Sequence, residues 1–371
     1  MIDSPNWFEV ANVDEIASPA LLLYPDRARE NVRRMIQIAG GAGRLRPHIK
    51  THKLAELVRM QIEEGIGKFK CATIAEAELA ANAGARDVLI AYPLVGPNVR
   101  RLVELAKRFP KTKFACLADD TEAIRAISKA FSSASMEVEV FLDVDCGQHR
   151  TGIGFGPPAL ELYRLIATLP GLKAGGLHVY DGHVHEADLA KRTTLCREAF
   201  GPADELRRDL LAAGLPVPRV VAGGTPTFPI HAENASVECS PGTCVLWDFG
   251  YSSKFADLNF LHAGLVLTRV VSKPGPNRLC LDLGHKAIGA ENPPPRVSFL
   301  NLPEAKPISH SEEHMVVESP AAAKLAAGHC LYGVPAHICP TVALYAEASV
   351  IGNGRAAQTW RVLARDRRLT I

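Results

Sequence analysis

Short apolar runs alternate with helix-like segments from residue 20 to about residue 225, and this alternation most limits how the chain can fold. The segments between the runs are rich in Ala, Leu, Glu and Arg and carry apolar residues at helical spacing, as in Leu54, Leu57, Val58 and Ile62. Strands that alternate with helices predict a parallel sheet with right-handed crossovers. Eight runs favour a closed (β/α)8 TIM-type barrel over an open doubly wound sheet, although the count alone does not separate the two. The expected strands are residues 20–23, 45–49, 69–73, 88–91, 113–117, 138–144, 176–180 and 219–222.

After about residue 250 the helical periodicity fades, and strand-like runs appear between Gly and Pro residues. These runs predict a smaller C-terminal β domain, with strands at residues 265–271, 278–283, 314–317 and 346–351. A chain of 371 residues is long enough for two domains of roughly 100–200 residues each. We therefore expect a barrel at residues 18–250 and a β domain at residues 251–371, to which residues 1–17 are added.

The charge balance argues against nucleic acid and anionic membranes as partners, because 42 Lys and Arg stand against 40 Asp and Glu without a basic cluster. The N-terminus carries acids and lacks the apolar core of a signal peptide, and no stretch approaches the roughly 18 apolar residues of a membrane span. Nine scattered cysteines, an odd number, indicate reduced thiols. The expected location is cytoplasmic.

A basic motif, Arg-Pro-His-Ile-Lys-Thr-His-Lys at residues 46–53, ends the second expected strand. In a barrel, the carboxyl ends of the strands face the active site. A lysine at this end, Lys50, can lose hydration, so that its pKa falls far enough for imine formation. Taken alone, the position fits a solvated surface lysine as well.

The same motif resembles the cofactor-lysine motif of the D-threonine aldolase and D-serine dehydratase family, which belongs to the alanine-racemase-like, fold-type III group of pyridoxal-phosphate enzymes. The resemblance extends in the same order over nearly the whole chain, through residues 18–20, 143–152, 223–227, 241–243 and 335–341. It implies that Lys50 carries pyridoxal 5'-phosphate as a Schiff base. It also implies a homodimer, in which the barrel of one subunit pairs with the β domain of the other.

Two Gly-Thr turns follow late expected strands, at residues 223–225 and 242–243. Phosphate groups bind to backbone N–H groups and hydroxyls that can approach closely, and barrels bind phosphate beyond their last strands. A simple turn is the alternative interpretation. The resemblance assigns the cofactor phosphate to Gly224, Thr225, Gly242 and Thr243.

The resemblance also assigns Arg150 to the phenolic oxygen of the cofactor and Tyr180 to its pyridine ring. Alanine racemases place an arginine against the ring nitrogen where this chain has Ser240. This difference favours the aldolase branch over a racemase.

His337 and Cys339 are candidate metal ligands. In an extended segment, residues two apart point to the same side, so both side chains can bind one ion. Imidazole with thiolate suits zinc, and two protein ligands leave positions open for water and substrate. A buried histidine and cysteine without a metal is the alternative. The resemblance implies a divalent metal (Mn, Zn or Mg) on the β-hydroxyl of the substrate, and Asp181, His183 and His185 are candidates for proton transfer.

These features together predict a lyase that acts on β-hydroxy-D-amino acids with pyridoxal phosphate and a divalent metal. The first hypothesis is a D-threonine aldolase, which cleaves its substrate to glycine and an aldehyde. The alternative is dehydration of D-serine or 3-hydroxy-D-aspartate to ammonia and a keto acid, favoured by Cys339, since many aldolases carry Asp at this place. An amino-acid racemase and a non-catalytic pyridoxal-phosphate-binding protein are weaker alternatives. A racemase needs a second base, which we cannot assign among Tyr251, Tyr332 and Tyr345, and the binding proteins lack a β domain.

Overall fold

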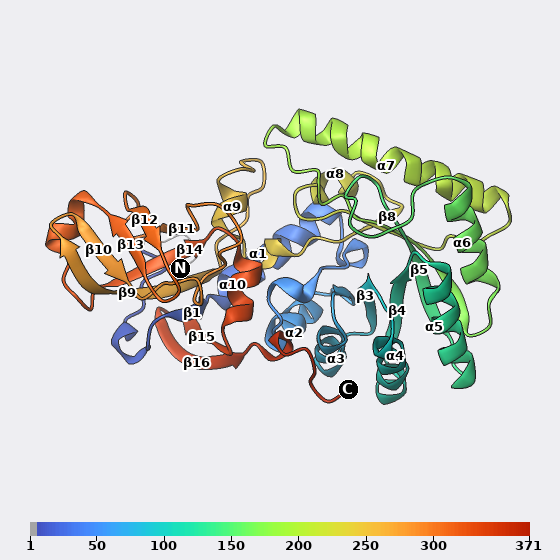
Figure 1. Ribbon diagram of the computed structural model, residues 1–371, viewed down its shortest axis with the longest axis horizontal. Helices are drawn as coiled ribbons and strands as arrows, with labels where there is room; N and C mark the ends of the chain where they lie inside the picture. Colours follow the sequence, from blue (N-terminus) through green and yellow to red (C-terminus); the bar gives the residue numbers. More distant parts are fainter. Residues whose placement is uncertain (1–5) are drawn as a thin grey trace. The chain divides into compact units, whose positions relative to one another are not determined.

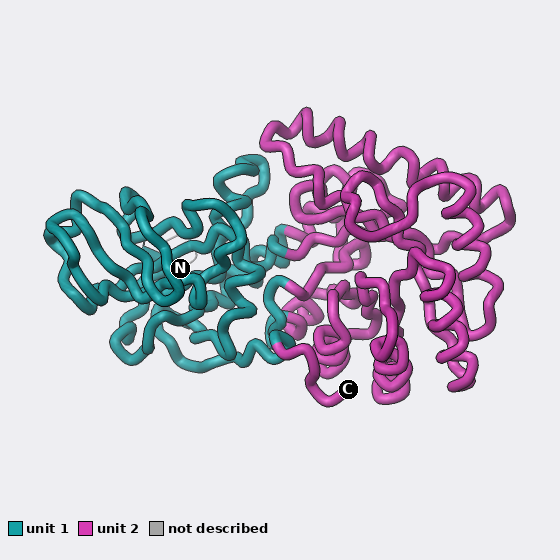
Figure 2. The backbone as a smooth tube through the Cα atoms, in the orientation of Figure 1, with its two compact units in different colours: residues 1–34, 51–57, 243–365 teal, residues 35–50, 58–242, 366–371 magenta. Residues whose placement is uncertain are grey.

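The structure, a computed structural model, describes residues 6–371 (Figure 1). Figure 2 colours its two compact units. The barrel unit consists of residues 35–50, 58–242 and 366–371, and the β unit consists, within the described residues, of residues 6–34, 51–57 and 243–365. Residues 1–5 of the predicted β domain lie outside the described residues, and the domain boundaries drawn from the sequence remain a prediction.

The barrel unit contains a parallel sheet of seven strands in chain order. Isolated bridges pair Leu45 with Cys239 and His48 with Lys70, so residues 45–48 connect the last strand of this sheet to its first. Seven strands and this segment supply the eight positions of the predicted TIM-type barrel, which is confirmed. The strands are β2 (Lys68–Cys71), β3 (Asp87–Pro93), β4 (Lys113–Ala118), β5 (Val138–Val144), β6 (Leu172–Val179), β7 (Val220–Ala222) and β8 (Val237–Cys239).

Helices alternate with these strands, as the sequence pattern predicts (Figure 1). The start of α3 shows why one helix begins where it does: the Thr73 hydroxyl accepts a hydrogen bond from the Glu76 N–H, and the Glu76 carboxylate accepts one from the Ala72 N–H. This reciprocal arrangement satisfies backbone donors that no helical carbonyl can reach. The helices of this part of the chain are α1 (Pro25–Ala39), α2 (Ala55–Glu63), α3 (Ile74–Asn82), α4 (Pro97–Arg108), α5 (Thr121–Ser133), α6 (Pro157–Thr168), α7 (Leu189–Ala212) and α8 (Phe228–Ala232).

Charged side chains at the amino ends of the strands close one end of the barrel. The guanidinium of Arg46, with a fully buried side chain, lies 2.7 Å from Asp87 Oδ1 and 2.8 Å from Glu238 Oε2. Lys68 at the start of β2 contacts the other oxygen of Glu238 at 2.6 Å. Because the carboxyl ends of the strands stay free of this network, the opposite end of the barrel is available for a binding site.

The β unit is built on a nine-stranded sheet. Its central path runs β12-β13-β10-β9-β1-β15-β16, with β14 on β9 and β11 on β14. The four strands expected after residue 250 are all present. Strands of this unit are β1 (Ala20–Leu23), β9 (Gly264–Gly275), β10 (Arg278–Leu281), β11 (Val297–Phe299), β12 (Lys306–His310), β13 (Met315–Glu318), β14 (Cys330–Pro335), β15 (Glu347–Gly352) and β16 (Arg355–Arg361), and its short helices are α9 (Phe249–Ser252) and α10 (Ile338–Leu344).

Strand β1 is where the sequence prediction is wrong. Residues 20–23 were expected as the first barrel strand, but they pair antiparallel with β9 and parallel with β15. A run of four apolar residues before a helix fits either sheet, because local periodicity does not identify the pairing partner. Among residues 6–371, no helix has both the length and the apolar character needed to cross a membrane.

Candidate cofactor and metal sites

A cavity of about 430 Å³ lies at the carboxyl ends of the barrel strands. Lys50 lines it from the 3-10 helix Ile49–Thr51, which follows directly on residues 45–48, and its backbone N–H donates to His48 Nδ1 at 3.2 Å. Arg150 follows β5 and Tyr180 follows β6, and both line the same cavity. The structure therefore brings together three residues that the sequence assigned to one cofactor.

The ring of Tyr180 forms a wall of this cavity against two glycines. A Cβ added to Gly182 would lie 2.4 Å from the ring atom Cε1, and one added to Gly224 would lie 3.2 Å from Cε2. On the cavity side, the Arg150 guanidinium carbon is 5.0 Å from the ring centroid, within cation–π range. Both glycines are therefore needed for the ring to hold this place.

The two predicted phosphate turns of the barrel unit are joined by a hydrogen bond. The Gly242 N–H donates to Thr225 Oγ1 at 3.2 Å, and the Gly224 N–H donates to Thr227 Oγ1 at the same distance. Thr225 is buried, and Gly223 adopts a φ of +78°, which favours glycine. Thr243 follows Gly242 in the chain and begins the 3-10 helix Thr243–Val245.

Several buried polar groups here have no partner among the described residues. The Nε2 atom of His178 and the hydroxyl of Ser240 make no hydrogen bond, and Ser240 lies two residues before Gly242 of the second phosphate turn. Lys70, which lines the cavity, is only 2% exposed. Buried polar atoms without partners are costly, so this pattern fits a site made for a polar ligand. The Lys50 amine, the Tyr180 ring and the two Gly-Thr turns are groups of the kind that bind pyridoxal phosphate.

His178 and Asp143 form a pair that the sequence analysis did not identify. His178 Nδ1 lies 2.7 Å from Asp143 Oδ1, and Thr151 Oγ1 donates to the other carboxylate oxygen at 2.8 Å. Burial lowers the pKa of His178, although the charge of Asp143 opposes this effect. A neutral imidazole whose Nδ1–H donates to Asp143 presents Nε2 to the cavity as an acceptor. The only signal in the sequence was the end of the expected strand 138–144.

Asp181 lies in a buried cluster with His231 and Cys196, two further residues that the sequence analysis missed. Asp181 Oδ2 is 2.7 Å from His231 Nε2, and Thr227 Oγ1 donates to Oδ1 at 2.8 Å. The Cys196 Sγ atom lies 3.6 Å from Asp181 Oδ2. These ligand-type atoms are close enough to hold an ion, but their hydrogen bonds already satisfy the carboxylate.

His183 differs from Asp181 in its surroundings. Its side chain is exposed and lies on Gly147, where an added Cβ would come within 2.8 Å of Nε2. His185 is exposed as well. Of the three candidates for proton transfer, the two histidines are accessible and Asp181 is not.

In the β unit, His337 and Cys339 lie together, but not in the extended segment that the sequence analysis expected. Strand β14 ends at Pro335, His337 is the N-cap of α10, and Cys339 lies in the first turn of that helix. The two side chains are close enough for the Cys339 thiol to raise the pKa of His337. The pair therefore depends on a strand-to-helix transition, which the flanking residues did not reveal.

Glu291 and Asp248 support the pair, and both were missed from the sequence. His337 Nδ1 lies 2.5 Å from Glu291 Oε1, and the Ile338 N–H that begins α10 donates to Asp248 Oδ2 at 3.2 Å. Burial alone would lower the pKa of His337, but Cys339 and Glu291 raise it to about 9. A carboxylate on Nδ1 leaves Nε2 as the metal-binding nitrogen, the usual arrangement at zinc-bound histidines.

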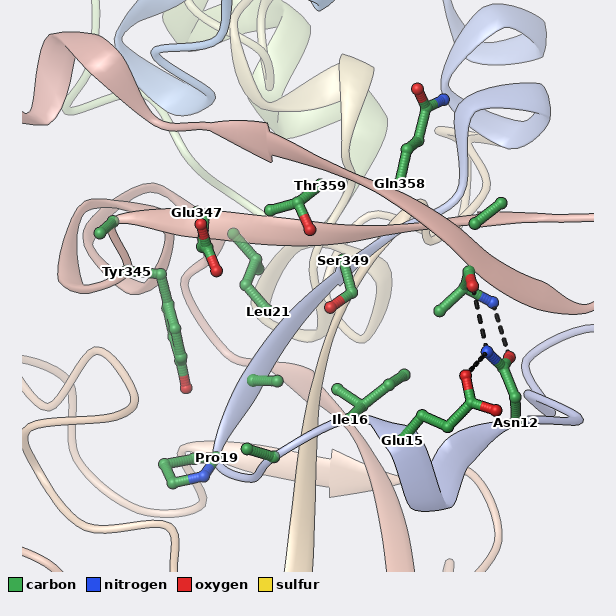
Figure 3. Close-up of a pocket in the computed structure, with 15 residues that line it drawn as sticks. Asn12, Glu15, Ile16, Pro19, Leu21, Tyr345, Glu347, Ser349, Gln358 and Thr359 are labelled. Atoms are coloured by element: carbon green, nitrogen blue, oxygen red, sulfur yellow. Dashed lines mark hydrogen bonds between the residues drawn. The ribbon is translucent and has the colours of Figure 1, made fainter.

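The β unit has another cavity, of about 450 Å³, between residues 12–21 and the strands β15 and β16 (Figure 3). Asn12 closes one side, donating to Glu15 Oε2 and to the Ala356 carbonyl at 2.8 and 3.1 Å. None of the residues predicted to bind cofactor or metal lines it. Lys50, Arg150 and Tyr180 line the cavity of about 430 Å³ in the barrel unit, whereas the four residues of the predicted phosphate turns are not among the residues that line it.

Comparison with known proteins identifies relatives over almost the whole chain. The family model described as "Alanine racemase, N-terminal domain" matches residues 24–248, and a model of a serine dehydratase domain matches residues 263–351. A D-threonine aldolase from Arthrobacter sp. is 30% identical over 326 residues, which is 86% of this chain and 85% of that protein. A D-threo-3-hydroxyaspartate dehydratase from Delftia sp. (strain HT23) is 32% identical over 215 residues, 57% of this chain and 56% of that protein.

Solved structures agree with these matches. The crystal structure of D-threonine aldolase from Filomicrobium marinum has a TM-score of 0.89 at 26% identity and covers 98% of both chains. A D-threo-3-hydroxyaspartate dehydratase with one cysteine replaced by alanine, described as the metal-free form, has a TM-score of 0.82 at 24% identity and covers 94% of this chain and 98% of its own.

Proposed function

The chain belongs to the family of proteins with an alanine racemase N-terminal domain, and from this premise we propose that it is a pyridoxal-phosphate-dependent lyase acting on β-hydroxy-D-amino acids. The observation that carries the proposal is the barrel cavity. Lys50, Arg150 and Tyr180 line it, together with His178, whose buried Nε2 has no hydrogen-bond partner among the described residues. Relatives named as aldolases and as dehydratases support both kinds of lyase.

We assign the cofactor to Lys50, Arg150, Tyr180 and the two Gly-Thr turns. When bound, pyridoxal phosphate supplies an electron sink for a cleaved substrate bond. Lys50 holds it covalently, and the turns with Gly224, Thr225, Gly242 and Thr243 hold its phosphate. Arg150 donates to its phenolic oxygen, and the ring of Tyr180 fixes its plane.

The divalent metal is assigned to His337 and Cys339. Such an ion polarises the hydroxyl that it binds and stabilises charge on that oxygen by several kcal/mol. Imidazole with thiolate favours zinc among the candidate ions Mn, Zn and Mg.

His183 is the proposed acceptor of the hydroxyl proton, because its imidazole is exposed, unlike the buried carboxylate of Asp181. Asp181 is proposed to act only indirectly and not to accept this proton itself, since His231 and Thr227 already engage both of its carboxylate oxygens. A positioned base of this kind contributes about 10²–10⁴-fold to the rate.

We place retro-aldol cleavage of D-threonine-like substrates first and dehydration of D-serine or 3-hydroxy-D-aspartate second. The match to the D-threonine aldolase covers most of both chains, whereas the match to the dehydratase covers little more than half. The observation on the side of the dehydratase is the cysteine in the metal pair. A cytoplasmic homodimer completes the proposal, and it is supported by the nine cysteines of the described residues, none of which forms a disulfide.

The test incubates the purified protein and pyridoxal phosphate with D-threonine, D-serine or 3-hydroxy-D-aspartate, in the presence of manganese, zinc or EDTA. Acetaldehyde and glycine from D-threonine, lost with EDTA, are the expected result. Ammonia with a keto acid would instead establish the dehydratase. L-isomers and the variants Lys50→Ala and Cys339→Ala serve as controls, and an active Lys50→Ala variant would contradict the cofactor assignment.

A further inference from the structure

A second lysine, Lys70, lines the cavity that contains Lys50. It is the third residue of β2, next to His48, with which it forms a parallel bridge. Its side chain is 2% exposed, whereas the side chain of Lys68 on the same strand is 25% exposed. A lysine is almost never buried to this degree unless it is paired.

Lys70 has no such pair among the described residues. Lys68 Nζ lies 2.6 Å from Glu238, but Lys70 Nζ makes neither a hydrogen bond nor an ion pair. Its Nζ lies 5.6 Å from the centroid of the Tyr180 ring. The amine is therefore directed at the cavity wall, on which Arg150 also lies, 5.0 Å from the same centroid.

This position makes the amine sensitive to a bound anion. Burial, followed by the charge of Lys50 and more weakly that of Arg150, lowers the pKa of Lys70 to about 7, although the charges of Asp143 and Asp181 oppose this effect. The charged and neutral forms of the amine are thus close in free energy near neutral pH. An anionic oxygen within reach of Nζ would favour the ammonium form and gain a charge-assisted hydrogen bond.

We propose that Lys70 is an anion-binding residue of the cavity, which donates from its buried, otherwise unpartnered Nζ to an anionic oxygen of the bound molecule. This inference rests on the proposed function. Two sources present that chemistry, the phenolate oxygen of the cofactor and a carboxylate of the amino-acid substrate. Lys70 is then a second cation beside Arg150, separate from the lysine that holds the cofactor.

The experiment compares the holoprotein with Lys70→Met and Lys70→Arg. Methionine keeps the length and burial of the side chain without its charge, and arginine keeps the charge. The matched control is Lys68→Met, which removes a lysine from the same strand but outside the cavity. Circular dichroism and cofactor content establish that each variant is folded and loaded.

Two readouts separate the sources. If Lys70 binds the phenolate, the pH titration of the cofactor absorbance shifts to higher pH in Lys70→Met, since a neighbouring cation disfavours the protonated Schiff base. If it binds a substrate carboxylate, KM rises about ten- to a hundredfold while the absorbance titration stays unchanged, as expected for loss of a hydrogen bond to a charged group. In both cases Lys70→Arg recovers part of the effect and Lys68→Met shows none.

A folded, loaded Lys70→Met variant with an unchanged absorbance titration and a KM within twofold of the parent would overturn the inference. Failure of the proposed function gives a different result, because the parent protein itself would then bind no pyridoxal phosphate or form no product. An equal effect of Lys68→Met would also overturn the inference, by showing that any charge lost from β2 has the same consequence.

Discussion

The Nδ1 atom of His337 lies 2.5 Å from the Glu291 carboxylate, and this contact determines which ring nitrogen is available to a metal ion. Replacing such a supporting carboxylate weakens metal binding by about 10–100-fold. We expect this loss for Glu291→Ala and a smaller one for Glu291→Gln, whose amide oxygen still accepts from Nδ1–H. Titration of zinc against a coloured chelator measures the affinity. Glu312→Gln is the control, because this exposed carboxylate pairs with Lys286, and an unchanged affinity in Glu291→Ala would remove Glu291 from the metal site.

Gly182→Ala should displace the Tyr180 ring. The added Cβ would lie within 2.6 Å of the ring atoms Cε1, Cζ and Oη, closer than real contacts allow. Because the ring is a wall of the cofactor cavity, we expect a clear loss of pyridoxal-phosphate affinity, measured by absorbance titration of the cofactor-free protein. Gly201→Ala is the control, since a Cβ there meets nothing within 4 Å and alanine favours the helix. Equal affinity in the two variants would show that Tyr180 can move without consequence.

Arg46→Met should destabilise the barrel by roughly 1.5–3 kcal/mol, because Asp87 and Glu238 lose the fully buried guanidinium but keep Arg219 and Lys68 as partners. The measurement is urea unfolding near neutral pH. Arg34→Met, which breaks the partly exposed pair with Glu30 and an exposed hydrogen bond to the Asn259 carbonyl, should cost no more than about 1 kcal/mol. A similar loss in both variants would mean that the charged network at the amino ends of the strands contributes little.

The same variant should change how stability depends on pH. Burial alone would raise the pKa values of Asp87 and Glu238, but Arg46 outweighs this effect and lowers both. Carboxylates whose folded pKa lies below the unfolded value stabilise the fold above the unfolded pKa, and this contribution is lost as pH falls through the folded pKa. Without Arg46 both pKa values rise, so acid unfolding should begin at a higher pH. An unchanged acid midpoint would contradict this assignment.

Asp143→Asn should lower the pKa of His178 further, because the charge of Asp143 is what opposes the effect of burial. NMR titration of the histidine ring measures the pKa directly, without reference to catalysis. Asp120→Asn is the control, since Asp120 caps α5 and asparagine caps equally well. A His178 pKa that stays the same or rises in Asp143→Asn would show that the charge of Asp143 does not stabilise the protonated form of His178.

The sequence predicted what depends on local order along the chain. The alternation of apolar runs and amphipathic segments predicted a parallel sheet and favoured a barrel, and the change of pattern near residue 250 predicted a strand-rich second part. The motif around Lys50 predicted a cofactor lysine through resemblance, because the motif lies in one short segment, and this role stays a prediction. The 3.6-residue period of an amphipathic helix and the two-residue period of a strand can be read from residues that are neighbours in the sequence.

Tertiary structure decided what depends on residues far apart in the chain. Strand β1 joins β9, whose residues lie more than 240 positions later, so the run at residues 20–23 could not reveal its sheet. Glu291 reaches His337 across 46 positions, and His178 reaches Asp143 across 35. The sequence analysis assigned no role to Lys70, and only the fold shows its burial beside Tyr180, on which the proposed anion-binding role rests. A contact is a property of two positions in space, and a single sequence specifies such pairs only through the fold.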